Sequence, residues 1–254
     1  MKRIDLNCDM GEMPEHISDG TQESLMPSFT SVNVACGGHA GDEQTMQTTI
    51  KQALRWKLAI GAHPGYPDRA NFGRLELKLP PEDVTDFVHQ QVRALAHIAA
   101  RCGAQLTHVK PHGALYNQAV RNREIAGAIA AGVARWTRNI VLVGLAGSPM
   151  LDVFRDAGFS VAAEAFADRR YEPDGTLRSR KHADALIHDP DEAAQQAMTI
   201  VQGKVVAQGG SEVALHADTL CIHSDTPGSP QIAAQVAKAL REAGFNVTPL
   251  TLSQ

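Results

Sequence analysis

Short apolar stretches alternate with longer amphipathic stretches along almost all of the 254 residues, and this alternation restricts the fold more than any other feature. Seven stretches are short and mostly apolar on both faces, which is typical of strands in a buried parallel sheet; they are Ile4–Met10, Ser31–Cys36, Leu58–His63, Gln105–Val109, Ile140–Leu145, Ser160–Phe166 and Thr219–His223. The stretches between them have the pattern of amphipathic helices; they are Glu43–Lys57, Pro81–Arg101, Arg123–Thr137, Pro149–Ala157, Pro190–Gln202 and Gln231–Ala243. A repeated strand–helix order predicts an α/β fold with a parallel sheet.

Residues at the predicted helix starts support these boundaries. Asn122, Ser148 and Asp189 stand where an N-cap side chain can accept a bond from the first turn. Asp42 is predicted to cap the helix that follows it and to orient the nearby His39.

The polar residues decide between a closed barrel and an open, doubly wound sheet. Nearly every predicted strand ends in ionisable or small polar residues, which are Asn7/Asp9, Cys36/His39, His63, Lys110/His112, Glu164/Asp168/Arg169 and His223/Asp225. An open sheet binds its ligand at one switch point, so only a few strand ends should carry such residues. In a barrel all strand ends meet at one mouth. The sequence therefore predicts a seven-stranded parallel β/α barrel, similar to a TIM barrel.

One segment interrupts the alternation. Residues from about 170 to 218 contain a polar loop, a short helix and, at Val205–Val213, a Gly-Gly pair between two strand-like arms that predicts a hairpin. The loop Tyr171–Lys181 follows a predicted strand end and could form a lid over the mouth. We therefore expect one domain over residues 1–254, with an excursion at about 170–218.

Charge and composition argue against several classes of function. Lys and Arg number 24 against 28 Asp and Glu, and aromatic residues make up 5%, so neither a basic surface nor a base-stacking platform is indicated. No apolar stretch approaches the roughly 20 residues that cross a bilayer, and no apolar signal core follows Met1. The four cysteines are scattered, as expected of reduced thiols. We expect a cytoplasmic protein with no nucleic-acid or membrane partner.

The first three predicted strands carry an acid and two histidines. Asp5, Asn7 and Asp9 share one face of their strand because side chains alternate along it. His39 follows the second strand after two glycines, and His63 closes the third. An acid and two imidazoles at neighbouring strand ends can act in acid–base catalysis or bind a divalent metal, although a close H-x-x-x-H pair is absent. The sequence leaves both possibilities open.

The later strands add a lysine and a second set of acids. Lys110 and His112 share a strand face, and a buried lysine is rare unless it is paired or functional. Glu164 and Asp168 also share a face, with Arg169 on the other face or at the rim.

These clusters give two groups of expected site residues. Catalytic roles are expected for Asp9, His39, His63, Lys110, His112, Glu164 and Asp168. Substrate binding is expected for Asn7, Arg169, Arg180 and His223, and the planar guanidinium of Arg180 suits a substrate carboxylate. If a metal is bound, its expected ligands are Asp9, His39 and His63. The chain has neither a G-x-x-x-x-G-K-[ST] phosphate loop nor a G-x-S-x-G nucleophile motif.

The same clusters, taken in order, resemble the LamB/YcsF family of 5-oxoprolinase A subunits. The matching stretches are Asp5–Glu12 (DLNCDMGE), Leu25–Asp42, Ile60–Pro67 (IGAHPGYP), Phe72–Arg74, His108–Asn117 (HVKPHGALYN), Glu164–Tyr171 (EAFADRRY) with Asp174-Gly175 and Arg180, and Cys221–Pro227 (CIHSDTP). They span nearly the whole chain. The sequence departs from the family pattern at Met13, Pro14, Gly38, Glu43 and Ser224.

The resemblance implies a barrel related to the glycoside hydrolase and deacetylase barrels. It further implies ATP-dependent opening of 5-oxo-L-proline to L-glutamate, with Mg²⁺ accompanying the ATP. Activation would proceed through phosphorylation of the amide oxygen, followed by attack of water. Two further subunits, similar to carboxylases or carboxyltransferases, would complete the enzyme.

Two other classes of function stay open at this point. One is a metal-dependent amidohydrolase or deacetylase that acts on another lactam or amide without ATP. The other is a substrate-binding, non-catalytic subunit. Intact Asp9, His39, His63, Lys110 and Glu164 argue against the non-catalytic subunit, because a scaffold has no need of buried charges.

Overall fold

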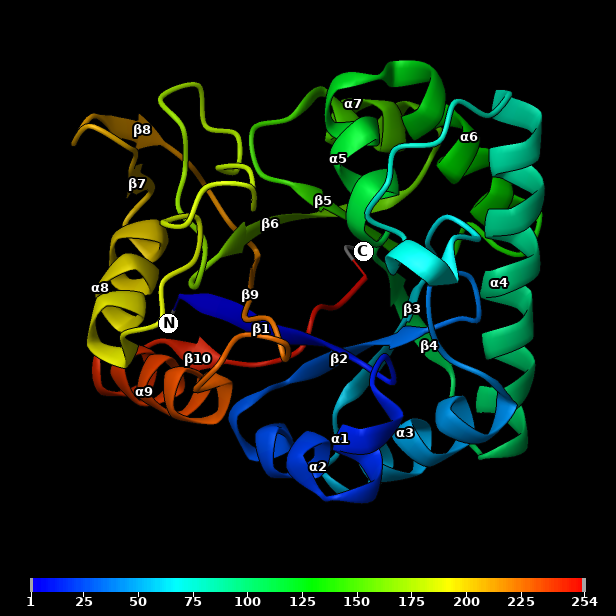
Figure 1. Ribbon diagram of the computed structural model, residues 1–254, viewed down its shortest axis with the longest axis horizontal. Helices are drawn as coiled ribbons and strands as arrows, with labels where there is room; N and C mark the ends of the chain where they lie inside the picture. The colour runs from blue at the N-terminus through cyan, green and yellow to red at the C-terminus, as the bar shows by residue number, and fades with distance from the viewer. Residues whose placement is uncertain (1, 253–254) are drawn as a thin grey trace.

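Seven parallel strands close into a barrel at the centre of the computed structural model, which describes residues 2–252 (Figure 1). Neighbouring strands pair in the order β1, β2, β3, β4, β5, β6 and β9. The barrel closes because β9 also pairs with β1. The strands are β1 (Arg3–Met10), β2 (Ser31–Ala35), β3 (Ala59–His63), β4 (Leu106–Val109), β5 (Val141–Leu145), β6 (Ser160–Phe166) and β9 (Thr219–Cys221). The predicted seven-stranded parallel barrel is confirmed. A two-residue strand, β10 (Asn246–Val247), also pairs with the first residues of β1.

The strand register brings three polar positions to one level of the barrel. Asn33 of β2 pairs with Asp9 of β1 on one side and with Gly61 of β3 on the other. Gly61 in turn pairs with His108 of β4. Because Gly61 has no side chain, His108 can reach across β3 toward Asn33.

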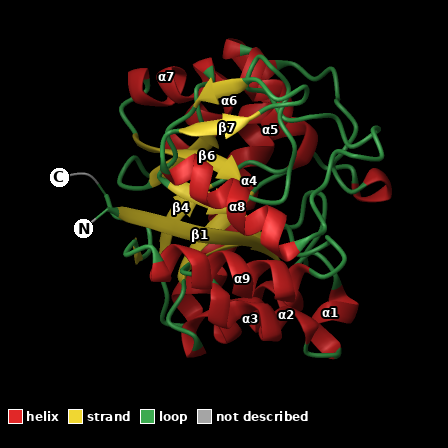
Figure 2. Ribbon diagram, turned by 90° about the vertical axis from the view of Figure 1, so that its left-hand side faces the viewer, coloured by secondary structure: helices red, strands yellow, loops and turns green. Residues whose placement is uncertain are grey.

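The predicted helices form around the barrel with small changes at their ends. They are α3 (Glu43–Arg55), α4 (Pro81–Arg101), α6 (Arg123–Ala134), α7 (Pro149–Asp156), α8 (Pro190–Val201) and α9 (Ser229–Glu242). Figure 2 shows α9, α3 and two short helices, α1 (Pro14–Ser18) and α2 (Thr21–Leu25), on one side of the strands, with α6 and α7 on the other. A further helix, α5 (Gly113–Arg121), was not predicted, and neither were α1, α2 or the 3₁₀ turns Met26–Ser28 and Arg69–Asn71.

Three of the four predicted caps are confirmed. Asn122, Asp189 and Asp42 accept bonds from backbone N–H groups in the first turns of α6, α8 and α3. Ser148 precedes α7, but its hydroxyl donates to the Leu145 carbonyl instead, so the prediction of a side-chain cap there is wrong. The carbonyl at the end of β5 competes for this hydroxyl and lies at 2.7 Å.

The excursion after β6 contains a loop, α8 and an antiparallel hairpin of β7 (Lys204–Val206) and β8 (Glu212–Ala214). The loop is tied to the barrel at Tyr171, whose side chain is fully buried and whose hydroxyl accepts a bond from Phe166 N–H at 2.8 Å. Arg169 also forms a bridge with Leu186. The start of the loop is therefore held against the end of β6, beside the mouth of the barrel.

Apolar side chains fill the space between the strands and the helices. On α4, for example, Val84, Val88, Val92 and Leu95 are completely buried, as their spacing predicts. All four cysteines are free thiols. No helix among residues 2–252 is long and apolar enough to cross a membrane.

Candidate active site

The carboxyl ends of the strands open into one cavity of about 760 Å³. Its lining includes seven of the residues expected at a site, namely Asp9, His63, Lys110, His112, Arg169, Arg180 and His223. The other four expected residues, Asn7, His39, Glu164 and Asp168, are buried behind this lining and contact it. Leu145, Phe166 and Leu177 add an apolar part to the wall.

Lys110 lines the cavity and contacts two acids. Its Nζ is 3.0 Å from Asp9 Oδ1 and 2.9 Å from Glu164 Oε1, and it donates to Asn7 Oδ1 at 3.3 Å. Burial alone would lower the pKa of Lys110, but the charges of Asp9 and Glu164 outweigh it and hold the pKa well above its usual value. Lys110 therefore carries a permanent positive charge.

Asp9 is held as a carboxylate between Lys110 and His63. Its Oδ2 is 3.3 Å from His63 Nε2. Burial would raise the pKa of Asp9, but the neighbouring charges of His63 and Lys110 hold it well below its ordinary value. Burial would lower the pKa of His63, but its contact with Asp9 and the charge of Glu12 outweigh burial and raise it.

Asn33 and His108, for which no role was predicted, hold the Asp9 carboxylate in place. The amide of Asn33 donates to Asn7 Oδ1 and to Asp9 Oδ1, each at 2.8 Å. Burial, together with the charges of Lys110 and His63, lowers the pKa of His108 to about 3. His108 is therefore neutral at pH 7, and its Nε2 lies 2.8 Å from Asn33 Oδ1 as a donor. The sequence signal for this contact is the glycine at position 61. A Cβ there would lie 2.1 Å from the His108 ring, so a larger residue would exclude the ring.

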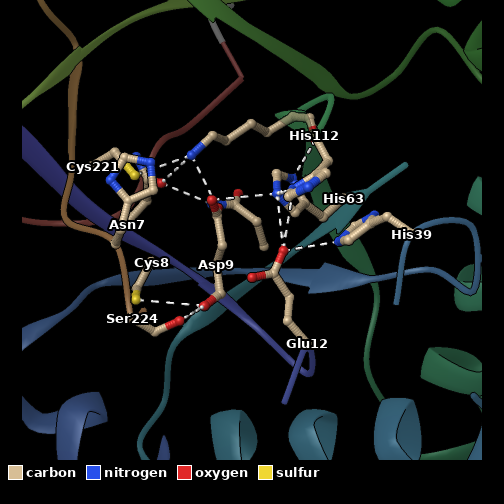
Figure 3. Close-up of polar contacts among 12 residues, drawn as sticks. Asn7, Cys8, Asp9, Glu12, His39, His63, His112, Cys221 and Ser224 are labelled. Atoms are coloured by element: carbon tan, nitrogen blue, oxygen red, sulfur yellow. Dashed lines mark hydrogen bonds and ion pairs between the residues drawn. The ribbon is translucent and has the colours of Figure 1, made fainter. Parts of the chain in front are cut away.

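A second cluster joins Glu12 to three histidines, and Figure 3 shows the Glu12 carboxylate facing their rings. Glu12 Oε1 is 2.9 Å from His39 Nε2, 3.2 Å from His112 Nδ1 and 3.8 Å from His63 Nε2. Glu12 belongs to the first sequence motif, but no role was predicted for it. Gly11, which has φ 78° and so turns the chain back after β1, was the signal that Glu12 enters the site.

The expected metal ligands do not form one group. Asp9 and His63 are close, but His39 contacts Glu12 instead. Within residues 2–252, the groups whose ligand atoms all lie within 4.8 Å are Glu12, His39, His63 and His112, and separately Asp9, Cys221 and His223. Asp42 is exposed where it caps α3, and Glu12 is the acid bonded to His39, so the prediction that Asp42 orients His39 is wrong.

Asp168 orients His223 at another part of the wall. Both Asp168 oxygens lie 3.1 Å from His223 Nδ1, and Asp168 also accepts bonds from His223 N–H and the Thr226 hydroxyl. Burial would raise the pKa of Asp168, but His223 outweighs it and lowers the pKa below its usual value. The ionised Asp168 keeps the proton of His223 on Nδ1, which leaves Nε2 free to accept one.

Two arginines meet one acid at the rim. Arg74 and Arg180 contact the same Asp225 oxygen at 2.5 and 3.0 Å. Arg169 is more deeply buried, and one of its N–H groups donates to the Arg178 carbonyl at 2.7 Å. Its Nε is buried with no hydrogen-bond partner among the described residues. Burial and the nearby Arg180 lower the pKa of Arg169 to about 10, so it remains charged at neutral pH.

Residues 4–254 match the sequence model of the LamB/YcsF family, and the chain belongs to that family. It is 47% identical over 248 residues to the 5-oxoprolinase A subunit of Chloroflexus aggregans, covering 97% of this chain and 98% of the relative. It is 43% identical over 249 residues to the 5-oxoprolinase A subunit of Pyrococcus abyssi, covering 98% of each.

Solved structures show the same fold. The lactam utilization protein of Thermus thermophilus matches with a TM-score of 0.89 and 41% identity, covering 97% of this chain and 99% of that chain. A putative cellobiose-phosphate cleavage protein of Enterococcus faecalis matches with a TM-score of 0.54 and 16% identity, covering 97% of each chain. The second likeness concerns the fold alone.

Proposed function

We propose that this chain is the A subunit of an ATP-dependent 5-oxoprolinase, which opens 5-oxo-L-proline to L-glutamate. The observation that carries the proposal is the 47% identity, over almost the full length of both chains, to a 5-oxoprolinase A subunit. The name of these relatives implies an enzyme of several subunits. We propose two partners similar to carboxylases or carboxyltransferases, and a cytoplasmic location where ATP is available.

The cavity has groups suited to each part of this substrate. The buried and unpartnered Nε of Arg169 offers a donor for the substrate carboxylate, and Arg180 offers a second donor if it leaves Asp225. Leu145 and Phe166 offer an apolar surface for the ring methylenes. This arrangement supports a small, acidic and cyclic amide as the substrate.

The reaction needs a stabilised oxyanion, an activated water and a proton for the leaving nitrogen. ATP supplies a phosphoryl group to the amide oxygen, which makes the stable lactam open to attack. The permanent charge of Lys110, which lines the cavity, favours negative charge developing beside it. His223, held by Asp168, accepts a proton from the attacking water at Nε2 and returns it to the leaving nitrogen as the C–N bond breaks. The γ-glutamyl phosphate that results is hydrolysed by a second water, which releases glutamate and phosphate.

A second candidate function is a metal-dependent amidohydrolase that needs no ATP. The convergence of Glu12, His63 and His112 at one edge of the cavity favours it, because such groups bind divalent ions. A purely substrate-binding subunit is the least favoured alternative. A network of buried ionised groups around Lys110 is costly to maintain without a chemical role.

The test is to purify the chain with the two proposed partner subunits and to follow glutamate and phosphate release from 5-oxo-L-proline. We expect glutamate only when ATP and all subunits are present, with one phosphate released per glutamate. Glutamate release by the isolated chain without ATP would instead establish the amidohydrolase. No glutamate from the complete complex would refute the proposed substrate.

A further inference from the structure

The protons on His63 and His112 are fixed by two backbone carbonyls. His63 Nδ1 lies 2.7 Å from the Lys110 carbonyl oxygen, and His112 Nε2 lies 2.9 Å from the Phe72 carbonyl oxygen. A carbonyl oxygen only accepts, so each of these ring nitrogens carries its hydrogen. In the neutral rings the other nitrogens, His63 Nε2 and His112 Nδ1, are therefore bare.

These two bare nitrogens face each other at 3.0 Å. Glu12 Oε1, which also only accepts when ionised, lies 3.2 Å from His112 Nδ1 and 3.8 Å from His63 Nε2. Three electron-pair donors thus converge with no hydrogen between them, and the Asp9 carboxylate, whose Oδ2 lies 3.3 Å from His63 Nε2, is a fourth close by. Such an arrangement requires a cation, which is either an added proton or a metal ion.

We propose that Glu12, His63 and His112 bind a divalent transition-metal ion of the Zn²⁺ class. Two ligand atoms that are each about 2.0–2.1 Å from a tetrahedral ion lie about 3.4 Å apart, and the three observed separations bracket this value. Bonds from the far ring nitrogens to carbonyls are the usual way in which metal-binding histidines are oriented.

The cavity places this ion where substrate can reach it. Glu12, His63 and His112 all line the cavity, so an ion bound to them keeps open positions for water or a carbonyl oxygen. His39 does not line the cavity. It stacks on His112 with ring centres 3.6 Å apart, and its Nε2 is 2.9 Å from Glu12 Oε1. We assign His39 as the positioning residue for Glu12.

Calorimetric titration of the chelator-treated chain with ZnCl₂ tests this inference. We expect one ion per chain with a Kd below about 10 µM. His63→Gln and His112→Gln should each weaken binding by at least about 100-fold, and His39→Gln by about 10-fold. The matched control is His97→Gln, on the exposed face of α4, which should bind as the wild type does.

A second measurement needs no variant. Addition of ZnCl₂ to ¹⁵N-histidine-labelled protein should shift the resonances of His63 Nε2 and His112 Nδ1 and leave those of His97 unchanged. A Kd above about 10 µM, unchanged affinity in either ligand variant, or unshifted nitrogens would overturn the site. These outcomes are independent of the lactam and of ATP, so they do not decide the proposed function.

Discussion

Replacing Lys110 with Met should destabilise the fold by about 4 kcal/mol at pH 7. Its Nζ is 3.0 Å from Asp9 and 2.9 Å from Glu164, whose side chains are 9% and 0% exposed. Without Lys110, Asp9 still has His63 as a partner, whereas Glu164 loses its cation. A buried carboxyl without a cation becomes neutral by taking up a proton. Counted from the reference pKa of about 4.3 for an exposed glutamate, this protonation costs about 4 kcal/mol at pH 7 and about 1 kcal/mol at pH 5. Breaking a buried pair typically costs about 3–5 kcal/mol, in agreement with the value at pH 7.

Urea unfolding of wild type and Lys110→Met, followed by circular dichroism at pH 7 and pH 5, measures this loss. Adding Glu164→Gln to the variant should restore most of the stability, because the unpaired acid is then removed. Lys204→Met is the matched control; it breaks an exposed pair with Glu212 and should change stability by less than about 1 kcal/mol. A Lys110→Met protein as stable as wild type at pH 7, or an equal loss at both pH values, would refute the reasoning.

Three further predictions concern other parts of the barrel. Gly61→Ala should lower the free energy of unfolding by about 1–3 kcal/mol, because the added Cβ would lie 2.1 Å from the His108 ring. Gly127→Ala on α6 is the control and should be neutral or stabilising, and urea unfolding compares the two variants. Burial raises the pKa of Asp5 to about 6 from 3.8, so its contribution to stability is lost as the pH rises through this range. The unfolding free energy of Asp5→Asn, measured relative to that of wild type, should therefore increase by about 3 kcal/mol from pH 3.5 to pH 7.5. The same difference between variant and wild type at both pH values would contradict this. Arg180→Met should raise the KM for 5-oxo-L-proline about 10-fold or more with little change in kcat, and an unaltered KM would remove Arg180 from the substrate site.

The sequence allows the barrel to be predicted because its strands and long helices have clear apolar patterns. Every barrel strand lies within two residues of its predicted bounds, and α4 has the predicted bounds. Helix α5 was missed because it begins at Gly113, two residues after a proline, where the sequence is typical of a loop. Its first turn is held by tertiary contacts, such as the bond from Ala114 N–H to the Gly73 carbonyl.

The polar residues of the site could be predicted, but not their pairing. Strand ends meet in any barrel, so Asp9, His63 and Lys110 were expected near one another. Which acid contacts which histidine depends on side-chain direction after a turn. Glu12 follows the left-handed Gly11 and contacts His39, a contact that strand periodicity cannot predict. His108 was missed because its contact with Asn33 crosses a strand at Gly61.

The most direct test of the central claim is the turnover of 5-oxo-L-proline by the assembled complex when this chain carries Asp168→Asn. Asp168 is fully buried and contacts His223, so the substitution changes the orientation and protonation of that ring without altering an exposed surface. We predict that the complex assembles as before and that kcat falls by about 10²–10⁴-fold, the usual range for loss of general acid–base catalysis. Wild-type turnover in the fully assembled variant complex would contradict the claim that the lactam is opened at this barrel mouth.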